Sequence, residues 1–365
     1  MFNKKCLEKL LKGKASTMKK KITYKDAGVD IAKADDVIAL SKNKIQETFN
    51  GNVLSTIGGF GSMYSLKDIL KDFDDPVLVQ SIDGVGTKMS VAQKANNFKY
   101  IGHDLVNACC NDVAATGAKP LTFLDYVAGS SLEKEAFAEI IKSVAVECKK
   151  HGVALVGGET AEMPGTYHKN EYDLVGIATG VVEKKKIVDG SNVQAGDVAI
   201  GVYSNGLHTN GYSLARKLIF ESMKLSTDDF LPGHDITVGE CLLAPHTNYS
   251  TLIQNLMQND LEIKSIAHIT GGGLVDNIPR VLPENMSLDI NINSWKKIPI
   301  FDFLKNSLDI DNEDLYQTFN MGIGLVLIVG LDEKDRALGL LGENNCTEIG
   351  LAIKDGTGAV HLNEK

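Results

Sequence analysis

The sequence lacks the features of several large protein classes. Its 38 lysines and arginines are outnumbered by 47 aspartates and glutamates, which gives a net charge of −9. A nucleic-acid-binding protein would ordinarily present a basic face, so this charge argues against that class. No apolar run approaches the ~18–20 residues of a membrane span, and we expect no membrane-spanning segment. No apolar core of about 7–15 residues follows the lysine-rich start either, so we expect no secretory signal.

Paired cysteines are also missing. None of the six cysteines forms a CxxC pair, and the composition is that of a soluble globular protein, with 43% apolar and 23% charged residues. Zinc clusters and disulfide frameworks normally show closely paired cysteines. We therefore expect reduced, partly buried thiols in a cytoplasmic protein. We also expect residues 1–20 to be an extension ahead of the first domain.

The familiar phosphate-binding motifs are absent, yet one turn has the composition of a phosphate site. In VLVQSIDGVGTK (77–88), an apolar strand ends at Asp83, and a turn with Thr87 and Lys88 follows. A P-loop requires GxxxxGK[ST], and no glycine lies five residues before Gly86. Asp83 could hold Mg²⁺, while Thr87 and Lys88 could contact phosphate oxygens. A tight glycine turn with a surface lysine explains this segment equally well.

The segment that follows reads as a helix with a polar face. Within residues 99–116, Asp104, Asn107 and Asn111 lie at i, i+3 and i+7, and Asp112 is adjacent. Polar groups on a half-buried helix are costly unless they find partners. A metal–nucleotide site would supply such partners, and a solvated polar face is the alternative.

Four more segments share one design, in which an apolar strand runs into glycines and a hydroxyl, amide or acid. They are GGFGSM (58–63), VGGETAEMPGTY (156–167), SNGLHTNGYSL (204–214) and HITGGGLVDNIPRVLP (268–283). Each one alone is explained by helix capping or a turn. Five such turns in one chain favour a ligand with several phosphates, or two phosphorylated ligands. His208, between two Asn/Gly turns, is a candidate oxyanion donor or general acid/base, with a structural loop histidine as the alternative.

Strand-like and helix-like segments alternate along the chain. We expect strands at 77–82, 121–128, 153–158, 172–183, 197–204 and 319–330, and helices at 99–116, 132–151 and from about Gly211. A polar, glycine-bearing stretch at 184–197 predicts a boundary between domains covering 21–187 and 188–365. Alternation alone favours a doubly wound sheet.

Read together, these segments resemble the phosphoribosylformylglycinamidine cyclo-ligase (AIR synthetase) family. The matching strings run in family order and are YKDAGVDI, GGFG, DGVGTK, IGHDLVNACCNDVAATGAKPLTFLDY, LVGGETAEMPGTYH, SNGLHTNGYSL, LLAP, HITGGGLVDNIPRVLP and YQTFNMGIG. The resemblance implies ATP-dependent closure of formylglycinamidine ribonucleotide to 5-aminoimidazole ribonucleotide, with release of ADP and phosphate. It also implies an α+β fold and a homodimer. The N-terminal ATP/Mg²⁺-binding domain would dimerise through its sheet, and the C-terminal domain would be a two-layer α/β structure.

The resemblance also assigns roles to individual residues. Asp83 and Asp112 would be the Mg²⁺ ligands, supported by Asp104 and Asn111. The other groups are the triphosphate contacts Lys42, Thr87 and Lys88; a flexible cover of Gly58, Gly59, Phe60 and Gly61; a reacting centre of Glu159, Thr160, His208 and Asn210; and a pocket for the substrate's ribose phosphate made by Ser204, Asn205, Thr270, Gly271, Gly272 and Gly273.

Two other interpretations remain open. One is a related ATP-dependent enzyme such as selenophosphate synthetase or thiamine-phosphate kinase. Selenophosphate chemistry wants a reactive cysteine near the N-terminal glycine loop, which has none, and GGETAEMPG is not expected in thiamine-phosphate kinases. The other is a nucleotide-binding maturation factor without this turnover. The presence of Asp83, Asp112 and His208 argues against such an inactive relative.

Overall fold

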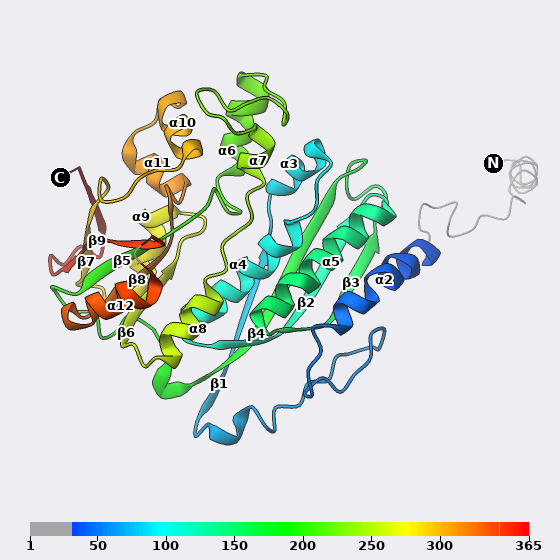
Figure 1. Cartoon of the computed structure of the whole chain (residues 1–365), viewed down its shortest axis with the longest axis horizontal. Coiled ribbons are helices and arrows are strands. Elements are labelled where there is room, and N and C mark those ends of the chain that lie inside the picture. The colour runs from blue at the N-terminus through cyan, green and yellow to red at the C-terminus, as the bar shows by residue number, and fades with distance from the viewer. Residues whose placement is uncertain (1–30, 343, 365) are drawn as a thin grey trace, which may run out of the picture.

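The computed structural model describes residues 31–342 and 344–364, and they form two sheet-based halves that lie side by side (Figure 1). The expected N-terminal extension, residues 1–20, lies outside the described residues. No helix in the described part of the chain is long and apolar enough to cross a membrane.

The first half is a four-stranded sheet with helices on one face. Its strands follow the order β1 (Pro76–Gly84), β4 (Tyr172–Glu183), β2 (Lys119–Gly129) and β3 (Ala154–Glu162). Helices α2 (Ile31–Gln46), α4 (Ile101–Ala115) and α5 (Lys134–His151) run side by side in front of it (Figure 1). The short helix α3 (Lys88–Ala95) follows the turn after β1, and η2 (Leu70–Asp72) precedes that strand.

The second half is a six-stranded sheet with several short helices. The strand order is β10 (Val360–Asn363), β7 (Ser287–Asn291), β9 (Cys346–Ile353), β5 (Val198–Tyr203), β8 (Ile323–Val329) and β6 (Ile263–His268). The helices are α6 (Tyr212–Arg216), continued by the π-helical turn η4 (Lys217–Ser222), then α7 (Val238–Leu242), α8 (Ser250–Gln258), α9 (Gly273–Asn277), α10 (Pro299–Ser307), α11 (Asn312–Thr318) and α12 (Lys334–Leu341). The 3₁₀ turns are η3 (Lys184–Lys186), η5 (Ile278–Val281) and η6 (Leu331–Glu333).

The doubly wound arrangement that alternation alone suggested is wrong. Among the strands of the described residues, only β2/β3 and β10/β7 pair in parallel, and the other pairs are antiparallel. Strand order depends on contacts between distant segments, and periodicity carries no information about them. The α+β class implied by the family resemblance is the one observed.

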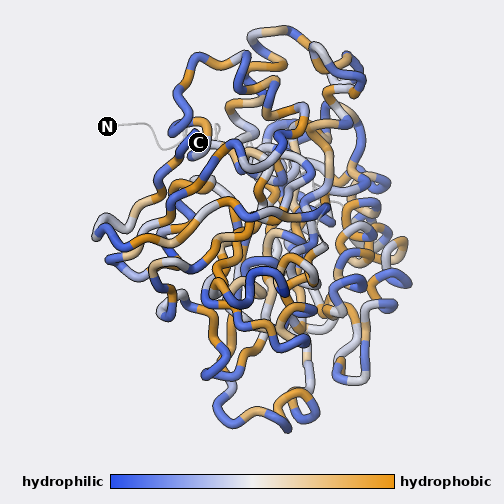
Figure 2. The backbone as a smooth tube through the Cα atoms, turned by 60° about the vertical axis from the view of Figure 1, so that its left-hand side comes forward, coloured by the Kyte–Doolittle hydropathy of each residue, from blue (hydrophilic) through white to orange (hydrophobic). Residues whose placement is uncertain are grey.

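Most individual elements are where the sequence predicts them. In α5, for example, Phe137, Ile140, Ile141, Val144 and Cys148 are all buried. The helix ends at Gly152, which takes the left-handed conformation with φ +67° that glycine favours. The apolar stretches lie mainly in the interior of the molecule, and many connecting loops are hydrophilic (Figure 2). The five cysteines in the described residues are unpaired and buried, as expected.

The two sheets bury their faces differently. Along β1, residues facing away from the helices stay open, with Leu78 61% and Ile82 67% exposed. Strand β8 is buried at every position. Its Leu325 and Leu327 belong to one apolar cluster with α8 and α12, and its Val326 to another that contains residues of α9 and α11. The second sheet is therefore covered on both faces around β8.

Candidate functional site

The polar face of α4 docks onto the backbone of the second half. Asp104 Oδ1 accepts the N–H of His246 at 2.6 Å, and Asn107 Nδ2 donates to the carbonyl of the same residue at 2.7 Å. Asn111 Oδ1 accepts the N–H of Tyr249 at 2.9 Å. We expected a metal–nucleotide site or solvent to satisfy these groups. The structure gives them protein partners, because the connection between α7 and α8 crosses the helix there.

Lys88 is buried beneath the same junction. Its side chain is 1% exposed, and Nζ lies 2.8 Å from Asp104 and 2.7 Å from the carbonyl of Ala244. Burial lowers the pKa of Lys88 and raises that of Asp104 to about 6, and the attraction between the two charges opposes both shifts. The alternative of a surface lysine is therefore wrong. Lys88 and Asp104 form an ion pair that joins the end of the DGVGTK turn to α4 and to the second half.

Asp83 and Asp112 form an acidic pair between β1 and α4. Asp112 Oδ1 lies 2.7 Å from His268 Nδ1, and its Oδ2 accepts the Ser81 hydroxyl at 3.1 Å. Burial raises the pKa of Asp83, the N–H of Gly84 counteracts this, and the negative charge of Asp112 raises the pKa further. A divalent cation would relieve that repulsion, and one or two carboxylates with substrate phosphates are the usual Mg²⁺ ligands. The described residues contain no group of three or more His, Cys, Asp or Glu side chains that could hold a metal ion, so the pair stands without a third protein ligand of these types.

His208 lies at the centre of a buried group of aromatic side chains. It adopts a left-handed backbone conformation, with φ +60°, and is fully buried. Its ring stacks on His246 with centroids 4.1 Å apart, and its Nε2 lies 3.3 Å from Thr247 Oγ1. Burial and the nearby His268 and Lys88 hold the pKa of His208 well below its ordinary value. The imidazole is therefore neutral at physiological pH, and its Nδ1 has no protein partner.

The turns predicted to bind phosphate lie beside this cluster. Thr87 Oγ1 is 3.3 Å from Ser213 Oγ, so the turn after β1 faces the 204–214 segment. A Cβ on Gly271 would lie 3.2 Å from Asn210 Oδ1, which brings the TGGG turn against the same segment. Ser204 donates to Asn320 at 2.8 Å and Thr270 to Asn277 at 3.3 Å, so both of these hydroxyls already have protein partners.

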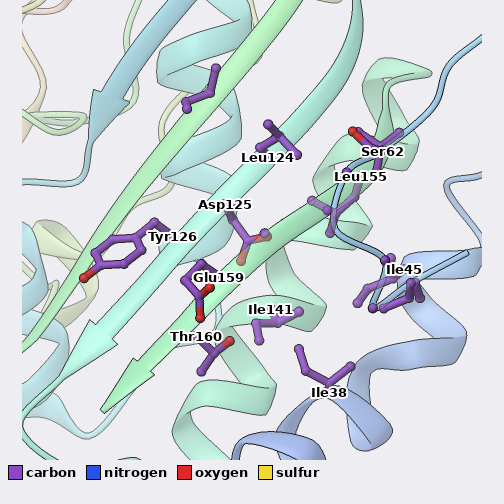
Figure 3. Close-up of a pocket in the computed structure, with 18 of the residues that line it drawn as sticks. Ile38, Ile45, Ser62, Leu124, Asp125, Tyr126, Ile141, Leu155, Glu159 and Thr160 are labelled. Carbon is purple, nitrogen blue, oxygen red and sulfur yellow. The ribbon is translucent and has the colours of Figure 1, made fainter. Parts of the chain in front are cut away.

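A cavity of about 750 Å³ lies elsewhere, against β2 and β3. Gly58 to Gly61 form one wall, and Asp125, Glu159 and Thr160 gather at its polar end, opposite apolar side chains from α2 and α5 (Figure 3). Lys42 is exposed on α2, one turn after Ile38, which lines the cavity. Burial raises the pKa of Asp125 to about 7.

The predicted reacting centre is therefore divided between two places. Glu159 and Thr160 line the cavity, whereas His208 and Asn210 lie at the junction between the halves, and neither is part of that cavity lining. Sequence reasoning missed three residues of the candidate site: Asp125, His246 and His268. His268 opens the HITGGG segment and could have been singled out. Asp125 carried no signal apart from its place in a family string, and His246, which directly follows LLAP, lies in none of them.

The buried histidines predict a loss of stability in acid. Burial lowers the pKa of His151 from 6.5 to about 4, so the unfolded chain takes up a proton between those values and the native chain does not. Stability contributed by the neutral ring is thus lost as pH falls through this window. Linkage gives roughly 2 kcal/mol at pH 5. His151→Gln, which keeps a donor toward Asn107, should reduce this loss.

The measurement is the thermal unfolding of both proteins between pH 7.5 and 5. The variant must be compared with the wild type at each pH, because Asp104 and Asp125 have raised pKa values. The stability that these two groups contribute increases as pH falls, opposite to the effect of His151. Identical pH profiles for the variant and the wild type would contradict the assignment.

Gly324, in β8, makes room for the aromatic group around His208. A Cβ there would lie 2.1 Å from the Tyr249 hydroxyl and 2.6 Å from His208 Cε1. We expect Gly324→Ala to displace one of these rings and to lower kcat at least about tenfold, because the sequence makes His208 a candidate acid or base and small misplacements of such a group are costly. Gly339→Ala is the matched control, because nothing lies within 4 Å of its Cβ. Steady-state kinetics of both variants decide the matter, and equal activity would show that the rings adjust freely.

Two family models match most of the chain. The AIR synthase related protein N-terminal domain matches residues 68–182, and the corresponding C-terminal domain matches residues 194–363.

Curated relatives match along almost their whole length. The phosphoribosylformylglycinamidine cyclo-ligase of Alkaliphilus oremlandii is 47% identical over 321 residues, covering 88% of this chain and 93% of the relative. The enzyme of the same name from Geotalea uraniireducens is 49% identical over 318 residues, covering 87% and 90%.

Solved structures share the fold at low identity. Thiamine-monophosphate kinase from Stenotrophomonas maltophilia has a TM-score of 0.66 at 19% identity, covering 90% of this chain and 96% of that one. The hydrogenase maturation protein HypE in complex with ATP also has a TM-score of 0.66, at 15% identity, with 90% of each chain covered. These two likenesses concern the fold alone. The family models and the curated relatives establish that the chain belongs to the phosphoribosylformylglycinamidine cyclo-ligases, the AIR synthetases of purine biosynthesis.

Proposed function

We propose that the junction between the two halves is where this cyclo-ligase activates its substrate. ATP would phosphorylate the formyl-amide oxygen of formylglycinamidine ribonucleotide, and a substrate nitrogen would then attack the same carbon and expel phosphate. Amide oxygen is a poor leaving group, so the reaction needs this activation and a site that keeps water out. The buried cluster around His208 meets the second need.

Asp83 and Asp112 are the proposed ligands of the magnesium that accompanies ATP. Mg²⁺ would neutralise the charge of the phosphates during phosphoryl transfer. Asp104, also a candidate from the sequence, is engaged by Lys88 at 2.8 Å and by the His246 N–H, so we assign it to the ion pair. Asn111 accordingly holds the second half in place, and Lys88 positions Asp104 and the turn that carries Thr87.

His208 is the proposed acceptor of the proton released on ring closure. Thr247 Oγ1 donates to Asn205 Oδ1 at 3.3 Å, so it can accept from His208 Nε2. That tautomer leaves Nδ1 as a lone pair without a protein partner. A neutral ring with a free lone pair can accept a proton, and Asn210 lies two residues away to orient the substrate.

Two further groups complete the proposed ligand contacts. The adjoining turns that contain Ser204, Asn205 and residues 270–273 would hold the ribose phosphate. The cavity beside Gly58 to Gly61 would accept another part of the ligands, with Lys42, Glu159 and Thr160 as its polar contacts and Phe60, fully exposed, as part of the cover.

The open face of the first sheet supports a homodimer. Ile82, Ile177 and Leu124 are register partners across β1, β4 and β2, so their side chains form an apolar row on that face. Two of the three also line the cavity, which a second chain would help to enclose. We expect Ile82→Glu to give a folded monomer by sedimentation velocity. Leu331→Glu, equally exposed on the second half, should remain dimeric. A monomeric wild type at micromolar concentration would contradict the proposal.

The observation that carries the site assignment is the close approach of Asp83, Asp112 and the His208 cluster, contributed by both halves. The test is a coupled assay of the purified protein with formylglycinamidine ribonucleotide and Mg-ATP. We expect 5-aminoimidazole ribonucleotide and ADP in equal amounts, and no product when Mg²⁺ is removed with a chelator. Product formation that is independent of divalent cations would overturn the metal assignment.

A further inference from the structure

Asn111 has a fixed orientation in the structure. Its Oδ1 accepts two backbone N–H groups, from Tyr249 at 2.9 Å and from Ser250 at 2.8 Å. A side-chain amide that accepts two donors on one side must present its NH₂ group on the other. Nδ2 accordingly donates to the carbonyl of Thr247 at 2.9 Å and lies 3.4 Å from His268 Nε2.

That orientation determines which nitrogen of His268 carries the proton. Its Nε2 faces the NH₂ group of Asn111 and also lies 3.0 Å from His246 Nε2. Asn111 Nδ2 can only donate toward Nε2, and a His246 Nε2 that also donates leaves only a lone pair unpaired on His246 Nδ1, which has no protein partner. We therefore assign Nε2 of His268 as the acceptor. The ring proton then sits on Nδ1, which donates to Asp112 Oδ1 at 2.7 Å.

Asp112 is consequently held at both oxygens while remaining accessible. Oδ1 accepts from His268 and Oδ2 from the Ser81 hydroxyl at 3.1 Å. Each carboxylate oxygen keeps a second lone pair, and the side chain is 39% exposed. His268 itself is only 3% exposed, so its ring cannot turn away from this contact without disturbing its surroundings.

We propose that His268 is a positioning residue for the metal ligand Asp112, and that Asn111 and His246 fix its donating tautomer. Each half of the protein contributes two of these four side chains, since Asn111 and Asp112 lie on α4 and both histidines on the second half. Docking of the halves therefore prepares the carboxylate for a cation. This inference rests on the proposed magnesium site.

Replacing the imidazole of His268 by a side-chain amide tests whether Asp112 needs the ring itself or only its N–H donor. In His268→Asn the amide nitrogen can occupy the place of Nδ1 and still donate to Asp112. In His268→Gln it reaches the place of Nε2, and the donor to Asp112 is lost. His103→Gln is the matched control, because His103 is another buried histidine, whose ring contacts Ser143 at 2.7 Å and Glu147 at 3.3 Å rather than the four side chains.

The experiment measures the affinity of Mn²⁺, added with a non-hydrolysable ATP analogue, by electron paramagnetic resonance. Loss of a hydrogen-bond partner behind a metal ligand typically costs about 10–100-fold in affinity. We expect that loss for His268→Gln, a change within a few-fold for His268→Asn, and none for His103→Gln. Thermal unfolding checks that each variant is folded, and absence of Mn²⁺ binding by the wild type would reject the metal site itself.

Two results would overturn the inference while the metal site stands. One is wild-type Mn²⁺ affinity in a folded His268→Gln protein. The other is an equal loss in His268→Asn and His268→Gln, which would show that the imidazole ring matters and its Nδ1–H does not.

Discussion

Replacing Asp83 with asparagine should remove most Mg²⁺-dependent turnover and leave the protein folded. Asparagine keeps the shape of the side chain and an oxygen that can accept the N–H of Gly84, which lies 2.7 Å from Asp83 Oδ1. It loses the negative charge that attracts the cation. Removing one electrostatic contact to a reacting group typically costs 10²–10³ in kcat, and we expect a loss on the order of 10²–10³-fold here.

The same substitution should not destabilise the protein without ligand. The pKa of Asp83 is raised by burial, so the native state holds its proton more tightly than the unfolded chain. Stability associated with that proton is lost as pH rises through the raised pKa, and at pH 7 the charged group opposes folding. Asp83→Asn should therefore unfold at the wild-type temperature or slightly above it. Near-wild-type kcat in this variant would show that Asp83 serves only the turn.

Replacing Lys88 with methionine should cause the largest loss of stability. The ammonium group lies 2.8 Å from Asp104 with both side chains at most 1% exposed, so methionine leaves a buried carboxylate unpaired. Breaking one partner of such a pair costs about 3–5 kcal/mol. Asp104 can escape part of this by binding a proton, since burial already raises its pKa to about 6.

A double variant separates this role from phosphate binding. Lys88→Met with Asp104→Asn removes both charges and keeps an oxygen that can accept the N–H of His246. We expect it to recover part of the unfolding temperature lost in Lys88→Met, because the carbonyl of Ala244 still lacks its donor. Calorimetric unfolding and nucleotide affinity should be measured for both proteins. If the Lys88→Met protein has an unchanged unfolding temperature and binds ATP more weakly, the result would instead support the direct phosphate contact that the sequence suggested.

The site could be predicted only in part from the sequence, and Asp104 shows why. Its place on the polar face of α4 was correct, but the expected ligand was a metal or nucleotide. The structure supplies Lys88 and the backbone of His246, 142 positions further along the chain. Helical spacing tells which side chains share a face. It does not tell what covers that face, because the partner can come from anywhere in the chain.

The same distinction holds for the whole protein. The sequence by itself determined the local elements, since the burial of α5 and the end of β1 at an acid and a glycine turn follow from periodicity and side-chain chemistry. Its ordered family strings also identified the reaction. Only the tertiary structure decided the strand order, the burial of Lys88, the separation of Glu159 from His208 and the contact between His268 and Asp112. Each of these depends on segments that are distant in sequence, and their docking is a balance of packing and desolvation over both halves.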